Sequence, residues 1–496
     1  SPAQVLAVSR DAAVPPELAT LVSLRDASPE MMEILRRVHF GELPTIYPPT
    51  SQAIFALASL ITPDDASIWH RMVIFKVWFV AFDMATLALV VLLLRYVGRP
   101  VAWSLAYGWC PLLIKEVANS GHLDAVAVFF TTLAIYLIVR ACYSAATWQE
   151  DCGTRRTRAR RTTIVAALML SLAIGAKLYP VVLVPLFLAV TRRQFGWRTA
   201  LGVAVVALIA TAVIMWPMVP KRELAELPEF RIPSASEDLP PLPPPHIGTE
   251  ARDPSESLRA FLGEWEMNDF LFLLLMENIR PTVELPPEEV AWFSMVPESW
   301  RKLARRFAGK ITGVEPSRTP FLLSRTMTSA ALLALAIVLA LQAGKRGTPA
   351  AFLEAAFLTV AWFWLILPTG NPWYWTWALP LLPFARGRAW LVLSGLVLVY
   401  YLRFWLVFHY PDPPVLGTRY NGALFFDYNV TWLEFGPWFA VLLLATLLRF
   451  RRCEHAQHKA APTIATIQEA GSGTAVGSPP NKITKPVISS KSKSPS

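Results

Sequence analysis

The chain has 496 residues, of which 54% are hydrophobic, and its mean hydropathy is +0.41, which excludes an ordinary soluble protein of this length. The formal net charge is +10, but many of the basic residues lie in short loops between apolar blocks, so the charge indicates membrane topology and not nucleic-acid binding. The four cysteines have no metal-ligand spacing, and we expect them to be reduced and structural.

The apolar residues form blocks close to the roughly 20 residues that a membrane-spanning helix needs. Residues 72–94, 199–216 and 390–408 are clear examples. Short basic loops separate the blocks, and the positive-inside rule places these loops in the cytoplasm. They contain residues 95–99, 155–161, 192–198, 345–346, 386–388 and 449–452.

Three longer apolar stretches each lie between two basic loops, so each must cross the membrane an even number of times. A polar turn divides each stretch, which predicts three helical hairpins with their turns at the non-cytoplasmic side. The turns are residues 115–124, 175–180 and 368–374. In total we expect about eleven crossings between Met72 and Leu448, starting outside and ending in the cytoplasm. The apolar run 53–61 is too short to span and predicts an interfacial helix.

The remaining segments complete an all-α polytopic architecture. Charge parity places residues 217–321 outside, with a proline-rich extended run at 239–245. Within this region we expect a serine-capped helix over 255–278 and an amphipathic helix over 288–310. The predicted domains are an external loop segment (1–46), an N-terminal membrane domain (47–216), an external domain (217–323), a C-terminal membrane domain (324–450) and a disordered cytoplasmic tail (451–496).

Ionisable and aromatic side chains gather at the non-cytoplasmic ends of the apolar segments. Ionisable groups at membrane depth are costly and mark functional sites. Any single one of them also fits a helix cap, a snorkelling side chain or an interfacial aromatic residue. The candidates at these ends are Tyr47, His122, Asp124, Lys177, Tyr179, Asn371, Trp373, Tyr374 and Glu434.

Six short motifs in this order resemble those of bacterial GT-C glycosyltransferases. They are Thr45-Ile46-Tyr47-Pro48-Pro49, Ser120-Gly121-His122-Leu123-Asp124-Ala125, Lys177-Leu178-Tyr179-Pro180, Trp265-Glu266-Met267-Asn268, Asn371-Pro372-Trp373-Tyr374 and Trp432-Leu433-Glu434. Within that superfamily the chain resembles the polyprenyl-phosphate-mannose-dependent mannosyltransferases, over residues 15–437.

The resemblance implies inverting transfer of a hexose, mannose in that group, from a polyprenyl-phosphate sugar to a lipid or glycan acceptor. It implies a bacterial inner membrane, an active face outside the cytoplasm, and neither cofactor nor metal. It adds Asn268 to the donor- and acceptor-binding candidates. Lys177 would contact the donor phosphate, and His122 and Asp124 would orient hydroxyl groups. Trp373 and Tyr374 would stack on a sugar, and Glu434 would bind its hydroxyls.

The catalytic base is the point at which the sequence departs from these relatives. They use a carboxylate soon after the first transmembrane helix, and no such helix precedes Tyr47. The resemblance therefore implies one further helix and the base upstream of Ser1, or else a catalytically degenerate relative. Within the chain, Asp124 and Asp26 are weak candidates. We therefore expect this chain to bind the donor without turning it over.

A lipid or sugar transporter, or a flippase, is the alternative function, because it would also combine apolar mass with intramembrane charges. Such proteins contain internal repeats with broken helices at the membrane midplane. The two halves of this chain show no repeat, and its polar turns gather at one side. The chain has no glycine-rich phosphate loop for a nucleotide sugar and no cluster of metal ligands.

Overall fold

A computed structural model describes residues 5–6, 14, 18–27, 29–38, 45–63, 65–143, 152–219, 256–263, 265–283, 285–313 and 317–448. The described residues form helices and contain no strand, only an isolated bridge between Met267 and Thr369. The chain divides into two compact units, Ser1–Trp438 and Phe439–Ser496. The expected proline-rich run and cytoplasmic tail lie outside the described residues.

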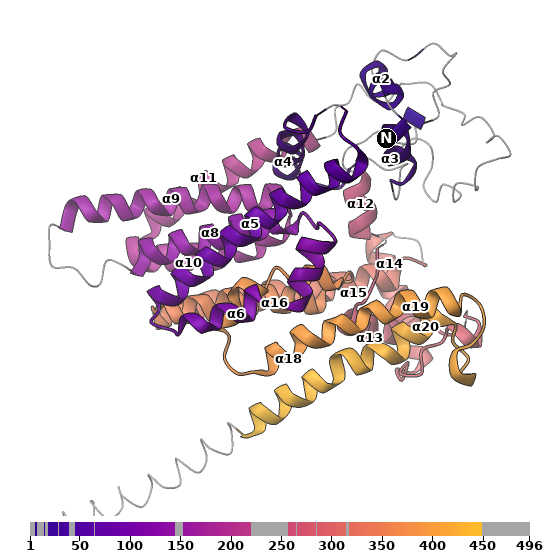
Figure 1. Ribbon diagram of the computed structural model, residues 1–496. Helices are drawn as coiled ribbons and strands as arrows, with labels where there is room; N and C mark the ends of the chain where they lie inside the picture. Colours follow the sequence, from indigo (N-terminus) through magenta and orange to yellow (C-terminus); the bar gives the residue numbers. More distant parts are fainter. Residues whose placement is uncertain are drawn as a thin grey trace, which may run out of the picture. The chain divides into compact units, whose positions relative to one another are not determined.

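The N-terminal half is a bundle of long apolar helices (Figure 1). Short helices α2 (Ala19–Ala27) and α3 (Pro29–Arg36) come first, followed by α4 (Pro49–Leu60), which covers the run predicted as an interfacial helix. The bundle itself contains α5 (Ile68–Tyr96), α8 (Asp124–Tyr143), α9 (Cys152–Ala176), α10 (Val184–Phe195) and α11 (Trp197–Met215). Helix α8 packs between α5 and α9, and α9 also packs against α4 and α11.

The C-terminal half begins with two long helices, α15 (Thr319–Arg346) and α16 (Pro349–Ile366), and α15 packs on α10 of the first bundle. The chain continues through α18 (Ala389–Leu396), η10 (Val397–Tyr401) and α19 (Leu402–His409). A short 3₁₀ turn, η11 (Val415–Gly417), then leads into α20 (Gly422–Phe425) and the π-helix η12 (Phe426–Val430).

Eight described helices are long and apolar enough to cross a membrane, so the chain has the build of an integral membrane protein. They are Ile68–Tyr96, Asp124–Tyr143, Arg156–Ala176, Trp197–Met218, Thr319–Arg346, Pro349–Ile366, Ala389–His409 and Gly422–Leu448. The other three of the eleven predicted crossings fall on shorter, broken segments, and their crossing stays a prediction.

The first broken segment contains η2 (Val101–Ser104), α6 (Leu105–Gly108), α7 (Pro111–Leu113) and the π-helix η3 (Ile114–Asn119). The second joins η5 (Tyr179–Leu183) to α10, and the third contains α17 (Pro372–Trp375) and η9 (Leu379–Phe384). Prolines at positions 111, 180, 372 and 380 stand at or near the helix starts, where the missing N–H is tolerated. Each broken segment begins or ends at one of the three polar turns.

Two predictions for the region after Met218, which ends η6 (Trp216–Met218), are wrong. The single helix expected over 255–278 is two helices, α12 (Glu256–Gly263) and α13 (Phe270–Ile279). The chain between them pairs with the turn at Thr369, and this distant pairing outweighs the local helical pattern. The amphipathic helix expected over 288–310 starts only at Glu298, as α14 (Glu298–Thr312), because η8 (Pro287–Glu289) and Pro297 interrupt the earlier part.

Candidate active site

An ion pair joins two of the polar turns. Asp124 is the first residue of α8, and Lys177 follows the last residue of α9. The Lys177 Nζ atom lies 2.6 Å from Asp124 Oδ1, and the same oxygen accepts a hydrogen bond of 2.5 Å from the indole N–H of Trp377. The side chains are 16% and 3% exposed for Lys177 and Asp124, so this contact is shielded from solvent.

Aromatic rings surround the Lys177 ammonium. Its Nζ atom lies 4.3 Å from the ring centroid of Tyr374 and 5.2 Å from that of Trp377, within the range of cation–π attraction. Trp377 is stacked between Tyr179, at 4.3 Å and 5°, and Tyr374, at 4.4 Å and 22°. Tyr179 also donates a hydrogen bond of 3.1 Å to Thr131. The second and third polar turns are therefore fixed together by one aromatic stack.

Tyr47 lies beside this group. Burial raises the pKa of its phenol, and the charges of Lys177 and Asp124 act on it as well. The helix that follows is anchored to the same place, because Ser51 donates a hydrogen bond of 2.8 Å to the carbonyl of Ala176. We call Tyr47, Asp124, Lys177, Tyr179, Tyr374 and Trp377 the lysine centre.

A second group of polar side chains involves Glu116, which is fully buried. His122 Nε2 lies 3.0 Å from Glu116 Oε2, and Lys115 Nζ lies 2.8 Å from Oε1. The hydroxyl of Tyr401 donates to Oε1 as well. The His122 ring is stacked on Trp373, with 4.8 Å between centroids and 18° between planes.

A third group forms where the broken helix 255–278 meets the turn at Thr369. Asn268 has a positive φ of 53°, and its side-chain amide donates to the carbonyl of Gly370 at 3.0 Å and to Glu434 Oε1 at 3.3 Å. A Cβ on Gly370 would lie 2.3 Å from the backbone carbonyl oxygen of Asn268, so only glycine permits this approach. Asn268 Oδ1 and Glu434 Oε2 are buried and have no hydrogen-bond partner among the described residues.

Two further carboxyl groups flank Asn268. Burial raises the pKa of Glu266 to about 7, and the carboxylates of Glu277 and Asp427 act in the same direction. Burial, and then the neighbouring Glu266, raises the pKa of Asp269 well above its ordinary value. Burial therefore favours the neutral acid form of Asp269 and shifts Glu266 in the same direction.

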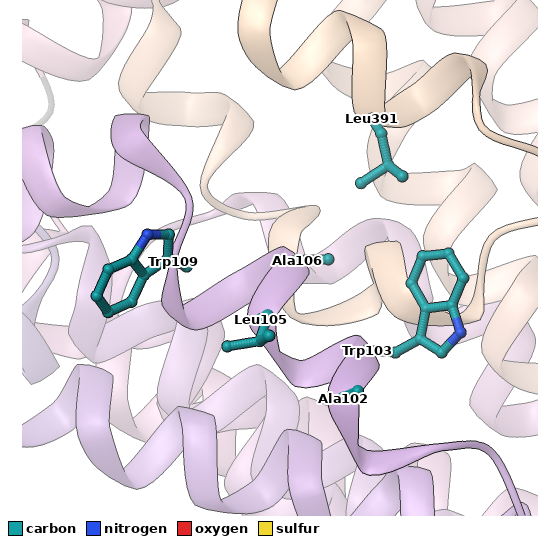
Figure 2. Close-up of a pocket in the computed structure, with 6 residues that line it drawn as sticks. All are labelled: Ala102, Trp103, Leu105, Ala106, Trp109 and Leu391. Carbon is teal, nitrogen blue, oxygen red and sulfur yellow. The ribbon is translucent and has the colours of Figure 1, made fainter.

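An apolar pocket of about 630 Å³ opens beside the first broken segment. Figure 2 shows its lining: side chains from η2 and α6 on one side and Leu391 from α18 on the other. The lining residues are Ala102, Trp103, Leu105, Ala106, Trp109 and Leu391. Helix α7, which belongs to the same broken segment, packs against both α18 and α17, the helix that holds Trp373 and Tyr374.

The structure brings together candidates from all three polar turns, with Tyr47 beside them and with Asn268 and Glu434 adjoining through Gly370. Asp26 is engaged elsewhere, since Arg25 donates two hydrogen bonds of 2.8 Å to its carboxylate. Sequence reasoning missed Glu116, Trp377 and Tyr401. Glu116 lies within the polar run 115–124 and Trp377 lies three residues after Tyr374, so both could have been identified as candidates from the sequence. Tyr401 lies in an apolar block 285 positions after Glu116, and nothing in its local sequence indicates a contact with Glu116.

The fold and these groups define the class: an all-helical, polytopic membrane protein with a buried polar centre built from the turns of its helical hairpins. Residues 45–267 match the model of glycosyltransferase family 87, a family of GT-C type membrane glycosyltransferases, and over this part of the chain the match confirms the resemblance to GT-C glycosyltransferases. It indicates that the protein is a glycosyltransferase. No curated protein and no solved structure matches the chain.

The matching segment contains Tyr47, Glu116, His122, Asp124 and Lys177, whereas Asn268, the turn 368–377 and Glu434 lie after it. Among the described residues, no group of three or more His, Cys, Asp or Glu side chains is arranged to hold a metal ion.

Proposed function

We propose that this protein transfers a hexose, with inversion, from a polyprenyl-phosphate sugar to a hydroxyl of a lipid or glycan acceptor at the non-cytoplasmic face of a bacterial inner membrane. The observation that carries the proposal is the lysine centre, in which one shielded cation lies where the three polar turns meet. Transfer from a polyprenyl-phosphate sugar releases a lipid phosphate, and a cation is needed to stabilise the negative charge that develops on it.

Lys177 suits the departing phosphate. An ammonium group has three N–H donors, and Asp124 takes one of them. The others are available to phosphate oxygens, on which negative charge grows as the bond to the sugar breaks. Asp124 and the two rings keep the ammonium in place, so little reorganisation is needed during the reaction.

The group around Asn268 suits the sugar. The buried oxygens Asn268 Oδ1 and Glu434 Oε2 have no hydrogen-bond partner among the described residues, and sugar hydroxyls are donors that would fit them. The turn 368–374 contains both Gly370, which contacts Asn268, and Tyr374, which belongs to the lysine centre, so this turn connects the two groups. A phosphate at Lys177 and a hexose toward Asn268 would therefore place the two halves of the donor in adjoining sites.

The apolar pocket suits the isoprenoid chain of the donor. Its six lining residues offer apolar and aromatic surface to the membrane interior. The pocket residues follow the basic loops 95–99 and 386–388 in the sequence, at the end of the helices opposite the lysine centre. Only a long isoprenoid chain would therefore reach the pocket from a phosphate at Lys177.

The positions of the basic loops support the proposed side of the membrane. Arg193 donates to the carbonyl of Lys345, while Arg346 and Arg386 both pair with Glu354. Arg99 donates to the carbonyl of Pro383, three residues before Arg386. Four basic loops therefore gather at one end of the helices, and the positive-inside rule supports a cytoplasmic position for that end. The lysine centre lies at the opposite ends of α8 and α9.

The test compares donor binding and transfer by the protein in nanodiscs, using a polyprenyl-phosphate hexose. Lys177→Met should lower kcat/KM by about 100-fold or more, because it removes the charge that stabilises the leaving phosphate. Lys302→Met is the matched control: its ammonium lies 3.9 Å from Glu298 on α14, and we expect it to keep the parental rate. Transfer by Lys177→Met at the parental rate would refute the phosphate role. Failure of the parental chain to bind the donor would refute the function itself.

A further inference from the structure

Helix α14 (Glu298–Thr312) presents a row of large apolar side chains that no part of the described structure covers. Trp300, Leu303 and Phe307 are 65%, 57% and 67% exposed. They stand three and four positions apart, so they share one face of the helix. Met295, just before the helix, is 77% exposed. A contiguous apolar surface of this kind indicates a binding partner, and we call these four residues the α14 face.

Helix α14 is not built to span a membrane. Its 15 residues extend about 22 Å, which is shorter than the hydrocarbon core of a bilayer. It also contains one acidic residue, Glu298, against five basic ones, which are Arg301, Lys302, Arg305, Arg306 and Lys310. Apolar side chains on one face and cations around them are typical of a helix that lies in the plane of the membrane surface.

Polar contacts hold α14 against the protein with this face outward. Arg301 is buried, and its guanidinium donates to the carbonyls of Val296 at 2.7 Å and Arg280 at 3.1 Å. Glu298 accepts a hydrogen bond of 3.1 Å from the backbone N–H of Thr282. These contacts fix α14 to the chain that directly follows α13. The buried side of the helix is therefore occupied, and the α14 face is left for an external partner.

The next helix brings α14 close to the bilayer. Helix α15 is long and apolar enough to cross a membrane, begins at Thr319, seven residues after the end of α14, and packs against it. The other end of α15 carries Lys345 and Arg346, which the positive-inside rule assigns to the cytoplasm. By the same rule α14 lies at the non-cytoplasmic surface, where the nearest large apolar partner is the outer leaflet.

Two cations flank the α14 face. Arg306 directly precedes Phe307 and Lys310 lies one turn after it, and both side chains are exposed. Long basic side chains at this position extend their apolar stems along the acyl chains and their charges toward the headgroups. Cations next to inserted apolar side chains match a leaflet that contains anionic phospholipids.

We propose that α14 is a membrane-surface helix that inserts Trp300, Leu303 and Phe307 into the non-cytoplasmic leaflet and binds the phosphate groups of anionic phospholipids through Arg306 and Lys310. The proposal goes beyond glycosyl transfer and does not rest on it. Because α14 is bonded to the chain after α13, its attachment to the leaflet holds the region that follows Asn268 at the membrane surface.

The first test locates the helix relative to the lipid. Single cysteines at Leu303, Phe307 or Lys302, in a chain without its four native cysteines, are labelled with a bimane fluorophore and studied in nanodiscs. Lys302 is the matched control, because its side chain is 42% exposed and it lies on the opposite face of α14. Lipids with a doxyl group near the headgroup end of the acyl chain should quench Leu303→Cys and Phe307→Cys several-fold more strongly than Lys302→Cys. Aqueous iodide should show the reverse order.

The second test identifies the headgroup. For the Leu303→Cys probe, doxyl-labelled phosphatidylglycerol is compared with doxyl-labelled phosphatidylcholine at equal mole fraction. We expect the anionic lipid to quench about 5-fold more strongly, because each surface cation attracts anionic lipid. Arg306→Gln/Lys310→Gln should bring the two lipids close to equality. The matched control is Arg192→Gln/Arg198→Gln, which removes two exposed cations near the cytoplasmic end of the helices and should leave the ratio unchanged.

Equal lipid quenching on both faces of α14 would overturn the proposal. So would a Leu303 probe that neither doxyl lipids nor iodide reach, because a second copy of the chain or another protein would then cover the α14 face. Equal quenching by the two lipids in the parental chain would refute the role of Arg306 and Lys310. These measurements need neither donor nor acceptor, so their failure is separate from a failure of the proposed glycosyl transfer. Thermal unfolding of each labelled protein verifies that it is folded.

Discussion

Asp124 and Lys177 form an ion pair in which each side chain fixes the position of the other. The carboxylate neutralises a cation that is 16% exposed and receives the indole of Trp377 at the same oxygen. The sequence supplied both residues as candidates because charged groups are rare at helix ends in a membrane. It did not supply their pairing, since they are 53 positions apart, nor Trp377, which is 253 positions from Asp124. Residue types and local spacing predict which groups are unusual, whereas partners depend on the packing of helices.

We predict that Asp124→Asn destabilises the protein more than the double substitution Asp124→Asn/Lys177→Met. Leaving one member of a buried ion pair without its partner costs about 3–5 kcal/mol, whereas replacing both members can be nearly neutral. Thermal unfolding of the purified proteins in one detergent provides the measurement, with Lys177→Met completing the cycle. Additive effects of the two single substitutions would contradict the coupling.

The elements were more predictable than the contacts between them. Long apolar blocks such as 72–94 and 199–216 became α5 and α11, because 20 apolar residues in a membrane leave the backbone few alternatives to a helix. The polar turns also lie at the predicted helix breaks. The helix expected over 255–278 failed because a backbone pairing with Thr369, about 100 residues later, opens the chain at Met267. Local periodicity contains no information about such a partner.

The broken segment 101–119 leads to a prediction about the pocket beside it. Ala106→Trp adds a large ring to the pocket wall, so we expect it to raise KM for a donor with a long isoprenoid chain by about 10-fold. A donor with a short chain, which does not reach the pocket, should be used as before. The ratio of kcat/KM for the two donors measures the effect. Ala102→Gly is the conservative control, and equal losses with both donors would argue against the pocket as the chain's position.

At the scale of the whole molecule, the site is divided between two parts of the chain. The segment that matches family 87 provides His122, Asp124 and Lys177, and the later turn and Glu434 complete their surroundings. The basic loops gather at the far ends of the same helices, with Arg346 and Arg386 sharing Glu354. Polar turns at one end and cations at the other are what a protein with one working face requires.

The orientation of the molecule can be measured directly. We predict that the region around Ser236 is outside and that both Gln194 and Ser472 are in the cytoplasm, because the basic loop 192–198 and the basic residues at 449–452 obey the positive-inside rule.

Single cysteines at these positions, in a background without Cys110, Cys142, Cys152 and Cys453, would be labelled with a membrane-impermeant thiol reagent in intact cells and again after permeabilisation. Ser236→Cys should react in both conditions, and Gln194→Cys and Ser472→Cys only after permeabilisation. Gln194 is the informative control, since it is exposed in the last turn of α10, next to Arg193, which donates to the carbonyl of Lys345. If Ser236→Cys and Ser472→Cys both reacted in intact cells, or both only after permeabilisation, an even number of crossings would lie between them. That result would exclude the odd number of crossings that the prediction requires.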